Sequence, residues 1–285
     1  MEKLKIAIQK SGRLSEKSME IISEAGISMN NGSRKLISVS TNFPVEILFL
    51  RDDDIPQYIA DGVADTGIVG ENVLAESGAG LEILERLGFA RCRMSLAVLK
   101  SIKYSGPSFF SGKRIATSYP NTLRCWLDSK GIEAEIHVIT GSVEIATGIG
   151  LADGIFDIVS SGSTLLSNGL KEVEMVMASE AVLLGSPGIG GRKAEILEEF
   201  LFRLRAVLAS RNNKYILLNA PNDKLDKIID AIPGMKSPTV LPLAIEGWSS
   251  VHSVVNENDF WQVIGKLRDY GAQGILVIPI EKMIV

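Results

Sequence analysis

Cysteine and histidine are scarce in this chain, whose 285 residues include only Cys92, Cys125, His137 and His252. The two cysteines form neither a Cys-x-x-Cys pair nor the disulfide framework of a small secreted domain, so they indicate a reducing cytoplasm. Two histidines argue against a histidine-based metal site. The expected location is therefore cytoplasmic.

Long apolar runs and a charge of one sign are also missing. The first eight residues lack the apolar stretch of a signal peptide, and no later run is long enough to span a bilayer, so we expect no membrane partner. The 30 basic and 34 acidic residues nearly balance, which gives no reason to expect a nucleic acid. The 46% hydrophobic content is ample for the cores of two or three domains.

What the sequence does contain is an alternation of apolar strands and amphipathic helices, which predicts an α/β fold. The pattern runs twice, once before and once after residue 94. It favours two similar lobes with a ligand between them, at the carboxyl ends of strands. The expected strands of these lobes are 4–8, 45–50, 66–69, 96–99, 114–117, 135–139 and 155–159, and the expected helices are 14–25, 55–60, 72–77, 122–130, a helix through Val143, and 192–210.

From residue 214 the order of expected elements becomes β-α-β-β-α-β, which predicts a separate ferredoxin-like α+β domain of about 70 residues. The domain boundaries we expect are residues 1–93 plus 182–211 for lobe I, 94–181 for lobe II, and 212–285 for the ferredoxin-like domain. Such domains often bind small effectors or pair across subunits, but the fold alone does not fix a function.

The segment after the expected strand 155–159 indicates a sugar-phosphate site. Five small residues follow that strand (Ser160, Ser161, Gly162, Ser163 and Thr164) and open a short helix, where backbone N–H groups can approach a phosphate. Asp157 and Glu144 are carboxylates suited to ribose hydroxyls or a magnesium ion. An ordinary turn with a helix N-cap explains the small residues equally well. The glycine spacing fits neither a Walker loop nor a dinucleotide fingerprint.

Cationic residues follow two strands of the first lobe. Lys10, Gly12 and Arg13 come after the first strand, and Arg51 after the second, a pattern that favours a polyphosphate contact, although solvated turns are the alternative. Tyr119 ends a strand of the second lobe, where it can stack on a base or pack the lobe edge. The three adjacent residues Asp52 to Asp54 cannot easily converge on one metal ion, and Asp53 and Asp54 are expected to begin the next helix.

Together these segments resemble the ATP phosphoribosyltransferase family, the first enzyme of histidine biosynthesis, in its long form with a regulatory C-terminal domain. The resemblance runs nearly end to end. It rests on residues 10–15, 51–56, 87–93, 114–120, 141–144, 150–170, 233–239 and 280–284. One departure is Thr147, where the family usually has proline after Glu-x-Ala, which relaxes a turn beside Glu144.

The resemblance implies two lobes of the type II periplasmic-binding-protein kind and a reaction in which N1 of the adenine of ATP attacks C1 of phosphoribosyl pyrophosphate, releasing pyrophosphate. It implies catalytic roles for Glu144 and Asp157, with Mg²⁺ near them. Phosphoribosyl pyrophosphate is assigned to Asp157 and the five small residues 160–164. The nucleotide or pyrophosphate is assigned to the set Lys10, Gly12, Arg13, Arg51 and Tyr119.

For the C-terminal domain, the resemblance implies feedback inhibition by L-histidine and a homo-oligomer that shifts between dimer and hexamer. The matching residues are Asn219, Met235, Ser237, Thr239 and Ser253, which otherwise read as ordinary turn and edge chemistry. Two other functions remain open from the residues alone. One is a non-catalytic solute-binding protein, and the other is an amino-acid sensor that uses only the ferredoxin-like domain.

Overall fold

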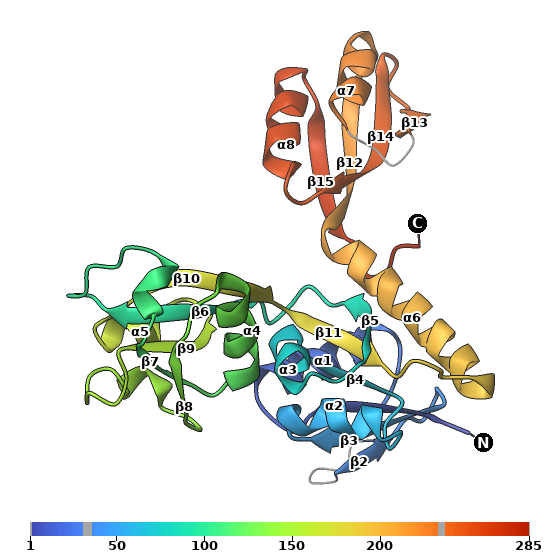
Figure 1. The fold of residues 1–285 in the computed structure, drawn as a ribbon. Helices are drawn as coiled ribbons and strands as arrows, with labels where there is room; N and C mark the ends of the chain where they lie inside the picture. The colour runs from blue at the N-terminus through green and yellow to red at the C-terminus, as the bar shows by residue number, and fades with distance from the viewer. Residues whose placement is uncertain (1, 31–35, 233–236, 285) are drawn as a thin grey trace. The chain divides into compact units, whose positions relative to one another are not determined.

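In a computed structural model of the chain, the structure describes residues 2–30, 36–232 and 237–284. The chain divides into two compact units, residues 1–23 with 27–198 and residues 24–26 with 199–285. The first unit holds two sheets and the second holds one (Figure 1). Over the described ranges, none of the helices combines the length and the apolar character needed to cross a membrane.

The first sheet of the larger unit, with its helices, is called lobe I here. Its strands lie in the order β2-β3-β1-β4-β11-β5, with β1 parallel to β3 and β4, and β11 antiparallel to its neighbours. The strands are β1 (Leu4–Gln9), β2 (Ile37–Val39), β3 (Val45–Leu50), β4 (Thr66–Gly70), β5 (Glu82–Arg86) and β11 (Ala181–Gly185). The helices are α1 (Arg13–Glu24), η1 (Asp52–Asp54), α2 (Ile55–Ala60) and α3 (Glu71–Ser77).

The second sheet, with its helices, is called lobe II. Its strands lie in the order β10-β6-β9-β7-β8, and β7 is parallel to β8 and β9. The strands are β6 (Cys92–Leu99), β7 (Arg114–Thr117), β8 (Glu135–Val138), β9 (Gly154–Val159) and β10 (Leu170–Ser179). The helices are η2 (Pro107–Phe110), α4 (Pro120–Lys130), η3 (Val143–Ile145) and α5 (Ser163–Ser167).

Both lobes follow one strand order. In each, three parallel strands lie second-first-third, and the next position is taken by an antiparallel strand that has just crossed from the other lobe, β6 in one direction and β11 in the other. Beyond that crossing strand lies β5 in lobe I and β10 in lobe II. Figure 1 shows β10 of lobe II continuing into β11 of lobe I. This shared order confirms the two α/β lobes of the type II periplasmic-binding-protein kind.

The smaller unit contains a four-stranded antiparallel sheet in the order β13-β14-β12-β15. Its elements are β12 (Asn213–Pro221), η4 (Asn222–Lys224), α7 (Leu225–Ala231), β13 (Thr239–Pro242), β14 (Trp248–Asn256), α8 (Phe260–Asp269) and β15 (Gln273–Pro279). The chain order β-α-β-β-α-β and this strand order are those of a ferredoxin-like domain, as expected. The helix α6 (Gly191–Arg211) leads into it.

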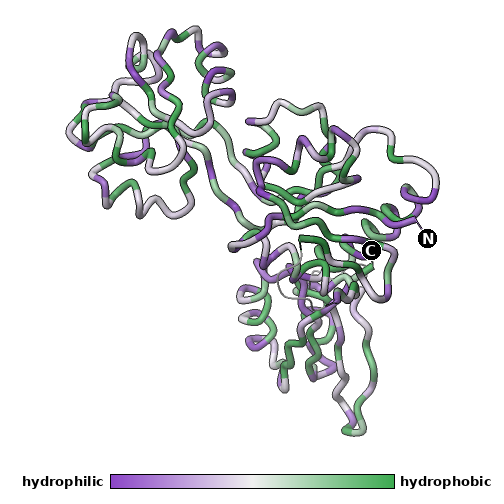
Figure 2. Tube along the Cα trace, turned by 90° about the horizontal axis from the view of Figure 1, so that it is seen from below, coloured by the Kyte–Doolittle hydropathy of each residue, from purple (hydrophilic) through white to green (hydrophobic). Residues whose placement is uncertain are grey.

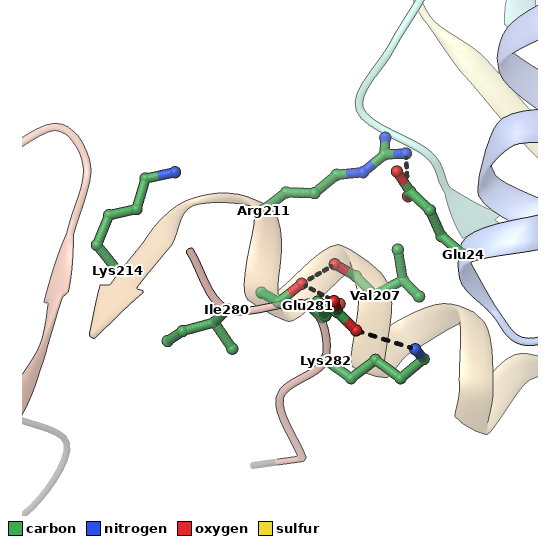
Figure 3. Close-up of a pocket in the computed structure, with 8 residues that line it drawn as sticks. Glu24, Val207, Arg211, Lys214, Ile280, Glu281 and Lys282 are labelled. Carbon is green, nitrogen blue, oxygen red and sulfur yellow. Dashed lines mark hydrogen bonds and ion pairs between the residues drawn. The ribbon is translucent and has the colours of Figure 1, made fainter. Parts of the chain in front are cut away.

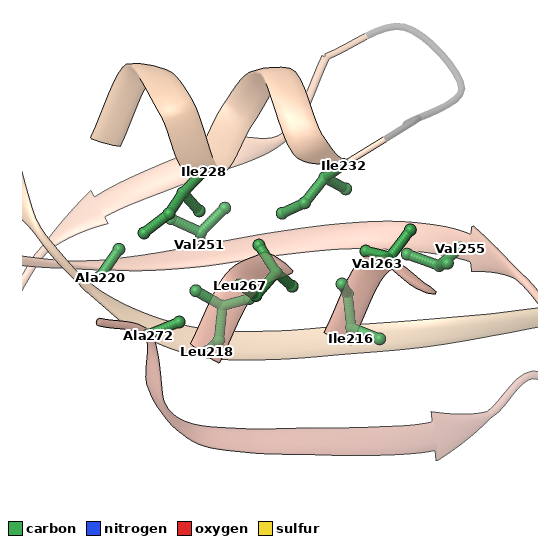
Figure 4. Packing of buried hydrophobic residues seen from close by; sticks show 10 residues of the cluster. All are labelled: Ile216, Leu218, Ala220, Ile228, Ile232, Val251, Val255, Val263, Leu267 and Ala272. Carbon is green, nitrogen blue, oxygen red and sulfur yellow. The ribbon is translucent and has the colours of Figure 1, made fainter. Parts of the chain in front are cut away.

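Alternation along the strands explains why the helices of this domain cover one face of the sheet. Ile216, Leu218 and Val251 are fully buried and pack against Ile228 of α7 and Leu267 of α8 (Figure 4). Successive strand residues point to opposite faces, so one face forms the core and the other does not. Figure 2 shows how hydrophobic and hydrophilic residues follow one another in short runs along the chain.

Candidate active site

The cationic residues that were predicted in lobe I follow the carboxyl ends of two neighbouring strands. Gln9 and Leu50 end β1 and β3 in register, and the backbone N–H of Lys10 donates to the carbonyl of Leu50 at 2.8 Å. Lys10 and Arg51 therefore leave the same sheet edge side by side. Gly12 has a φ of +92°, a conformation that glycine adopts without a Cβ clash, and Arg13 begins α1 directly after it.

Lobe II contributes the opposite wall of a cavity of about 400 Å³. Its lining comes from both lobes: Arg51, Asp52, Asp53, Val73, Glu76 and Ser77 of lobe I, and Ser118, Tyr119, Thr140 and Gly141 of lobe II. The backbone N–H of Tyr119 donates to Thr117 Oγ1 at 2.8 Å, and Ser118 Oγ donates to the carbonyl of Ile139 at 2.7 Å. These bonds fix the turn that presents the tyrosine to the cavity.

Tyr119 is close to carboxylates of both lobes. Burial raises the pKa of its phenol, and the negative charges of Asp157, Asp53 and Asp52 raise it further. The hydroxyl therefore stays protonated at neutral pH and can donate a hydrogen bond. The structure thus brings two of the five residues assigned to the nucleotide, Arg51 and Tyr119, to one cavity.

Asp157 lies in β9 opposite Ser95 of β6, near the point where the strand runs into the small-residue loop. Burial raises the pKa of its carboxyl group, and repulsion from Glu144 raises it further. A hydrogen bond of 2.7 Å from the N–H of Ile158 to Oδ1 opposes both effects. The two predicted acids are therefore near enough to repel each other. A partly desolvated carboxylate beside a like charge is suited to stabilising a cation or binding one.

Glu144 belongs to a single 3-10 turn, η3, where the sequence predicted a helix through Val143. Ser142 precedes this turn with a φ of +52°, which is uncommon for a residue that carries a Cβ. Val143 and Ala146 are buried on the same small turn and hold it against β9. The carboxylate of Glu144 is thus presented from a tight, packed turn rather than from a helix.

Thr147 ends this turn with an orphaned hydroxyl. Its side chain is 6% exposed, and among the described residues Oγ1 has no hydrogen-bond partner. Burial of an unpaired hydroxyl opposes folding. Proline, which the family usually has here, carries no such group.

Replacing Thr147 with valine is expected to raise the free energy of unfolding by about 1 kcal/mol, since the similar side chain carries no buried hydroxyl. Denaturant titration of both proteins measures this difference. Thr122→Val is the matched control, because the hydroxyl of Thr122 donates to Glu76 Oε2 at 2.8 Å. The control is expected to lose stability, and a Thr147→Val protein that also loses stability would contradict the assignment.

The small residues predicted to hold a phosphate form an exposed loop that leads into α5. Gly162 has a φ of +80°, and Ser161 Oγ and Ser163 Oγ are 2.9 Å apart. The helix α5 has only five residues, so the loop's own N–H groups, rather than a long helix dipole, are the available phosphate donors. The first N–H groups of a helix have no partner within it. Ser160, Ser161 and Gly162 form the loop, and Ser163 and Thr164 are the first two residues of α5.

An ion pair that the sequence did not predict is hydrogen-bonded to the backbone at the start of this loop. Arg93 Nε and Nη2 donate to the two carboxylate oxygens of Glu172, each at 2.5 Å, and Arg93 Nη1 donates to the carbonyl of Ser160 at 3.1 Å. Ser95 Oγ donates to Glu172 Oε1 at 2.7 Å. The guanidinium lowers the pKa of the Glu172 carboxyl. Arg93 and Glu172 are 79 residues apart, so no local pattern pairs them.

Metal binding by the protein alone has limited support. Across the ranges that the structure describes, no group of three or more His, Cys, Asp and Glu side chains is arranged to hold a metal ion. Glu144 and Asp157 supply two carboxylates. Mg²⁺ commonly uses one or two carboxylates together with substrate phosphates, so this pair fits a magnesium ion that arrives with a pyrophosphate.

A second cavity, of about 330 Å³, lies in the smaller unit and contains none of the predicted site residues (Figure 3). Its cations already have acidic partners. Arg211 Nη2 is 2.8 Å from Glu24 Oε2, Lys214 Nζ is 3.3 Å from Glu257 Oε2, and Lys282 Nζ is 4.0 Å from Glu281 Oε2. This pairing makes it a poor anion site.

The residues predicted to bind histidine are divided between the two faces of the ferredoxin-like sheet. Asn219 lies opposite Ser250, and Thr239 opposite His252, on the face away from the core. Ser253 is 7% exposed, lies opposite the buried Ile216 and points to the core face. Ser237 is exposed, with Oγ donating to the carbonyl of Pro238 at 3.3 Å. Met235 lies outside the described residues.

The fold and the cavity define a two-lobed α/β protein with a cavity between the lobes and a separate ferredoxin-like domain. The family model described as ATP phosphoribosyltransferase matches residues 51–206, and the model described as its C-terminal domain matches residues 210–282. The chain belongs to the ATP phosphoribosyltransferase family, in the long form, and is an enzyme of histidine biosynthesis.

Full-length relatives agree with this family. The ATP phosphoribosyltransferase of Bacteroides thetaiotaomicron is 60% identical over 282 residues, which are 99% of this chain and 100% of the relative. That of Cytophaga hutchinsonii is 56% identical over 281 residues, which are 99% of this chain and 98% of the relative. A chain of the ATP phosphoribosyl transferase (HisG:HisZ) complex from Thermotoga maritima is 32% identical, with a TM-score of 0.64 over 72% of this chain and 98% of that one.

Proposed function

We propose that this enzyme transfers the 5-phosphoribosyl group of phosphoribosyl pyrophosphate to N1 of the adenine of ATP and releases pyrophosphate. The observation that carries the proposal is the placement of Asp157. Its desolvated carboxylate is close enough to Glu144 for repulsion and lies three residues before the segment 160–164. Tyr119, which interacts electrostatically with Asp157 and with Asp53 of lobe I, connects this group to the wall that carries Arg51.

The chemistry matches these residue types. Adenine N1 has a lone pair at neutral pH, so the nucleophile needs no strong general base, and catalysis depends on positioning and on charge stabilisation. As pyrophosphate leaves, the ribose becomes cationic at C1. We propose that the ionised carboxylates of Asp157 and Glu144 orient the ribose hydroxyls and stabilise that charge. We assign Lys10, Arg13 and Arg51 to stabilising the negative charge that develops on the leaving pyrophosphate.

The proposal also assigns residues to the remaining substrate groups. The backbone N–H groups and hydroxyls of loop 160–164 bind the 5-phosphate, and Gly12 allows a phosphate to approach the N-terminus of α1. Tyr119 contacts the nucleotide, with its protonated hydroxyl as a donor. Glu144 and Asp157 would hold a Mg²⁺ ion that arrives with the pyrophosphate, and such an ion would neutralise negative charge there. The two free cysteines fit a reducing cytoplasm as the site of the reaction.

We also propose feedback inhibition by L-histidine through the ferredoxin-like domain. Asn219 and Thr239 share the face of its sheet that is not covered by the core, where a ligand can reach them, and Ser237 lies beside them in sequence. The buried Ser253 supports the sheet from the other face. A homo-oligomer that pairs these faces would couple histidine to activity only if histidine binds its dimer and hexamer unequally.

An ultraviolet absorbance assay tests the reaction directly, because ribosylation at N1 changes the adenine chromophore. Purified protein is mixed with ATP, phosphoribosyl pyrophosphate, Mg²⁺ and pyrophosphatase, and absorbance is expected to rise only when both substrates are present. Added L-histidine is expected to suppress the rise. Folded protein that gives no signal would contradict the proposed reaction, and a signal indifferent to histidine would contradict the feedback alone.

A further inference from the structure

A glutamate of lobe I makes a set of hydrogen bonds to lobe II at the edge of the shared cavity. Glu76, in α3, accepts from the backbone N–H groups of Asn121 and Thr122, each at 2.9 Å, and from Thr122 Oγ1 at 2.8 Å. In return, Asn121 Nδ2 donates to the backbone carbonyl of Glu76 at 3.0 Å. Four hydrogen bonds therefore join one residue of lobe I to two successive residues of lobe II.

These bonds supply the N-terminal cap of α4. The helix begins at Pro120, and its N-cap residue, Tyr119, makes no side-chain hydrogen bond to the helix. The first N–H groups of a helix need partners from outside it, and a carboxylate is the favoured one, because this end of a helix is positive. Here the partner is Glu76, which comes from the other lobe. The cap of α4 thus depends on how the two lobes are placed.

The same contact holds the two walls of the cavity in place relative to each other. Glu76 and Ser77 line it from lobe I together with Arg51 and Asp53, while Tyr119, directly before the capped helix, lines it from lobe II. Any opening of the lobes at this edge would break the cap and move Tyr119 away from Arg51. The residues assigned to phosphoribose, by contrast, all lie within lobe II, on β9, η3 and the loop 160–164.

We infer that Glu76 is a positioning residue for the nucleotide half of the reaction. By capping α4 across the lobes, its carboxylate holds Tyr119 opposite the lobe I cations at the separation that ATP requires. The inference rests on the proposed function for the location of ATP. The inference predicts different effects on the two substrates. Loss of the cap weakens the ATP site, which spans both lobes, and spares the phosphoribose site, which lies in lobe II alone.

The test is steady-state kinetics of Glu76→Gln with each substrate varied in turn. Glutamine keeps the size of the side chain but presents an amide donor where two N–H groups also donate. We expect the KM for ATP to rise about tenfold, as the loss of one or two charge-assisted hydrogen bonds would give, with the KM for phosphoribosyl pyrophosphate changed less than about twofold. Unchanged kinetics, or an equal rise in both KM values, would overturn the inference.

Glu71→Gln is the matched control, because Glu71 lies on the same helix and is also hydrogen-bonded, to Arg86 Nη1 at 2.5 Å and Nη2 at 2.7 Å, but within lobe I. It is expected to keep both KM values. A similar rise in the KM for ATP in this control would assign the effect to general loosening of α3 and overturn the inference.

A second variant keeps the test valid if Glu76→Gln folds poorly. Thr122→Val removes one of the hydrogen bonds to Glu76 from the lobe II side and is expected to raise the KM for ATP in the same selective way. The double variant should show less than the sum of the two effects in free energy, since both act through one contact. Fully additive effects of the two substitutions would overturn the inference. Wild-type turnover in the same assay keeps this outcome distinct from failure of the proposed reaction.

Discussion

Replacing Asp157 with asparagine is expected to lower turnover by about a hundredfold or more, the usual size of a lost electrostatic contribution at a reacting centre. Asparagine keeps the shape and the hydrogen bond from Ile158 but carries no charge to set against the ribose cation. The ultraviolet assay measures the loss. Near-normal turnover in the folded variant would remove Asp157 from the mechanism.

The same substitution is expected to leave the protein at least as stable at neutral pH. The folded state raises the pKa of Asp157, through burial first and Glu144 second, so its ionised form opposes folding above that raised pKa. Asparagine removes the penalty. The stability gain should therefore shrink as pH falls through the raised pKa, where the wild-type carboxyl is already protonated. Thermal melts at neutral and acidic pH measure this dependence.

Asp153 provides a control of the opposite sign, four residues earlier in the chain. A hydrogen bond of 2.9 Å from the N–H of Arg114 is the main cause that lowers its pKa. Its ionised form therefore favours folding above the ordinary pKa of aspartate, and this contribution is lost as pH falls through the lowered value. Asp153→Asn is expected to lower the melting temperature at neutral pH and keep its turnover. If both substitutions changed stability in the same direction, the opposite pKa shifts assigned to Asp157 and Asp153 would be contradicted.

Local sequence patterns predicted most of the elements that carry the site, because each is a short apolar strand followed directly by polar residues. The strand 45–50 and the helix 55–60 have the bounds that the sequence indicated. The loop 160–164 was found for the same reason, since its small residues are contiguous. Such features need no information from distant parts of the chain.

The strands β10 and β11, which lead from lobe II back to lobe I, were not predicted, and their geometry explains why. β10 is paired with β6 through two register shifts, between Glu172 and Glu174 and between Met175 and Met177. Each shift interrupts the alternation of inward and outward side chains on which strand prediction depends. β11 is only five residues long and entirely buried, so it shows no alternation at all.

The residues that hold the site in place also could not be predicted from local sequence patterns. Glu76 caps a helix that starts more than 40 residues later, and Glu172 pairs with an arginine on another strand. A lone glutamate on a helix or strand has the same sequence signature as a solvated surface residue. These residues become meaningful only once the sheet order places their partners beside them.

Gly162→Ala is expected to raise the KM for phosphoribosyl pyrophosphate roughly tenfold, equivalent to about 1.4 kcal/mol of lost binding. Gly162 has a φ of +80°, a left-handed conformation that costs a residue with a Cβ about 1 to 2 kcal/mol. Space is not the obstacle, because the added Cβ would lie 3.9 Å from Val159 Cγ1, an ordinary contact. The loop is therefore expected to relax its backbone and turn N–H groups away from the 5-phosphate.

Gly169→Ala separates this effect from the backbone cost itself. Gly169 follows the other end of α5 with a φ of +71°, and an added Cβ would meet nothing within 4 Å. Both variants should therefore lose a similar amount of stability in denaturant titrations, but only Gly162→Ala should weaken the sugar-phosphate substrate while leaving the KM for ATP unchanged. Equal kinetics in the two variants would show that the loop conformation does not bind the phosphate. A selective effect at Gly162 would place the 5-phosphate against the backbone of this loop, because no side chain is removed by the change.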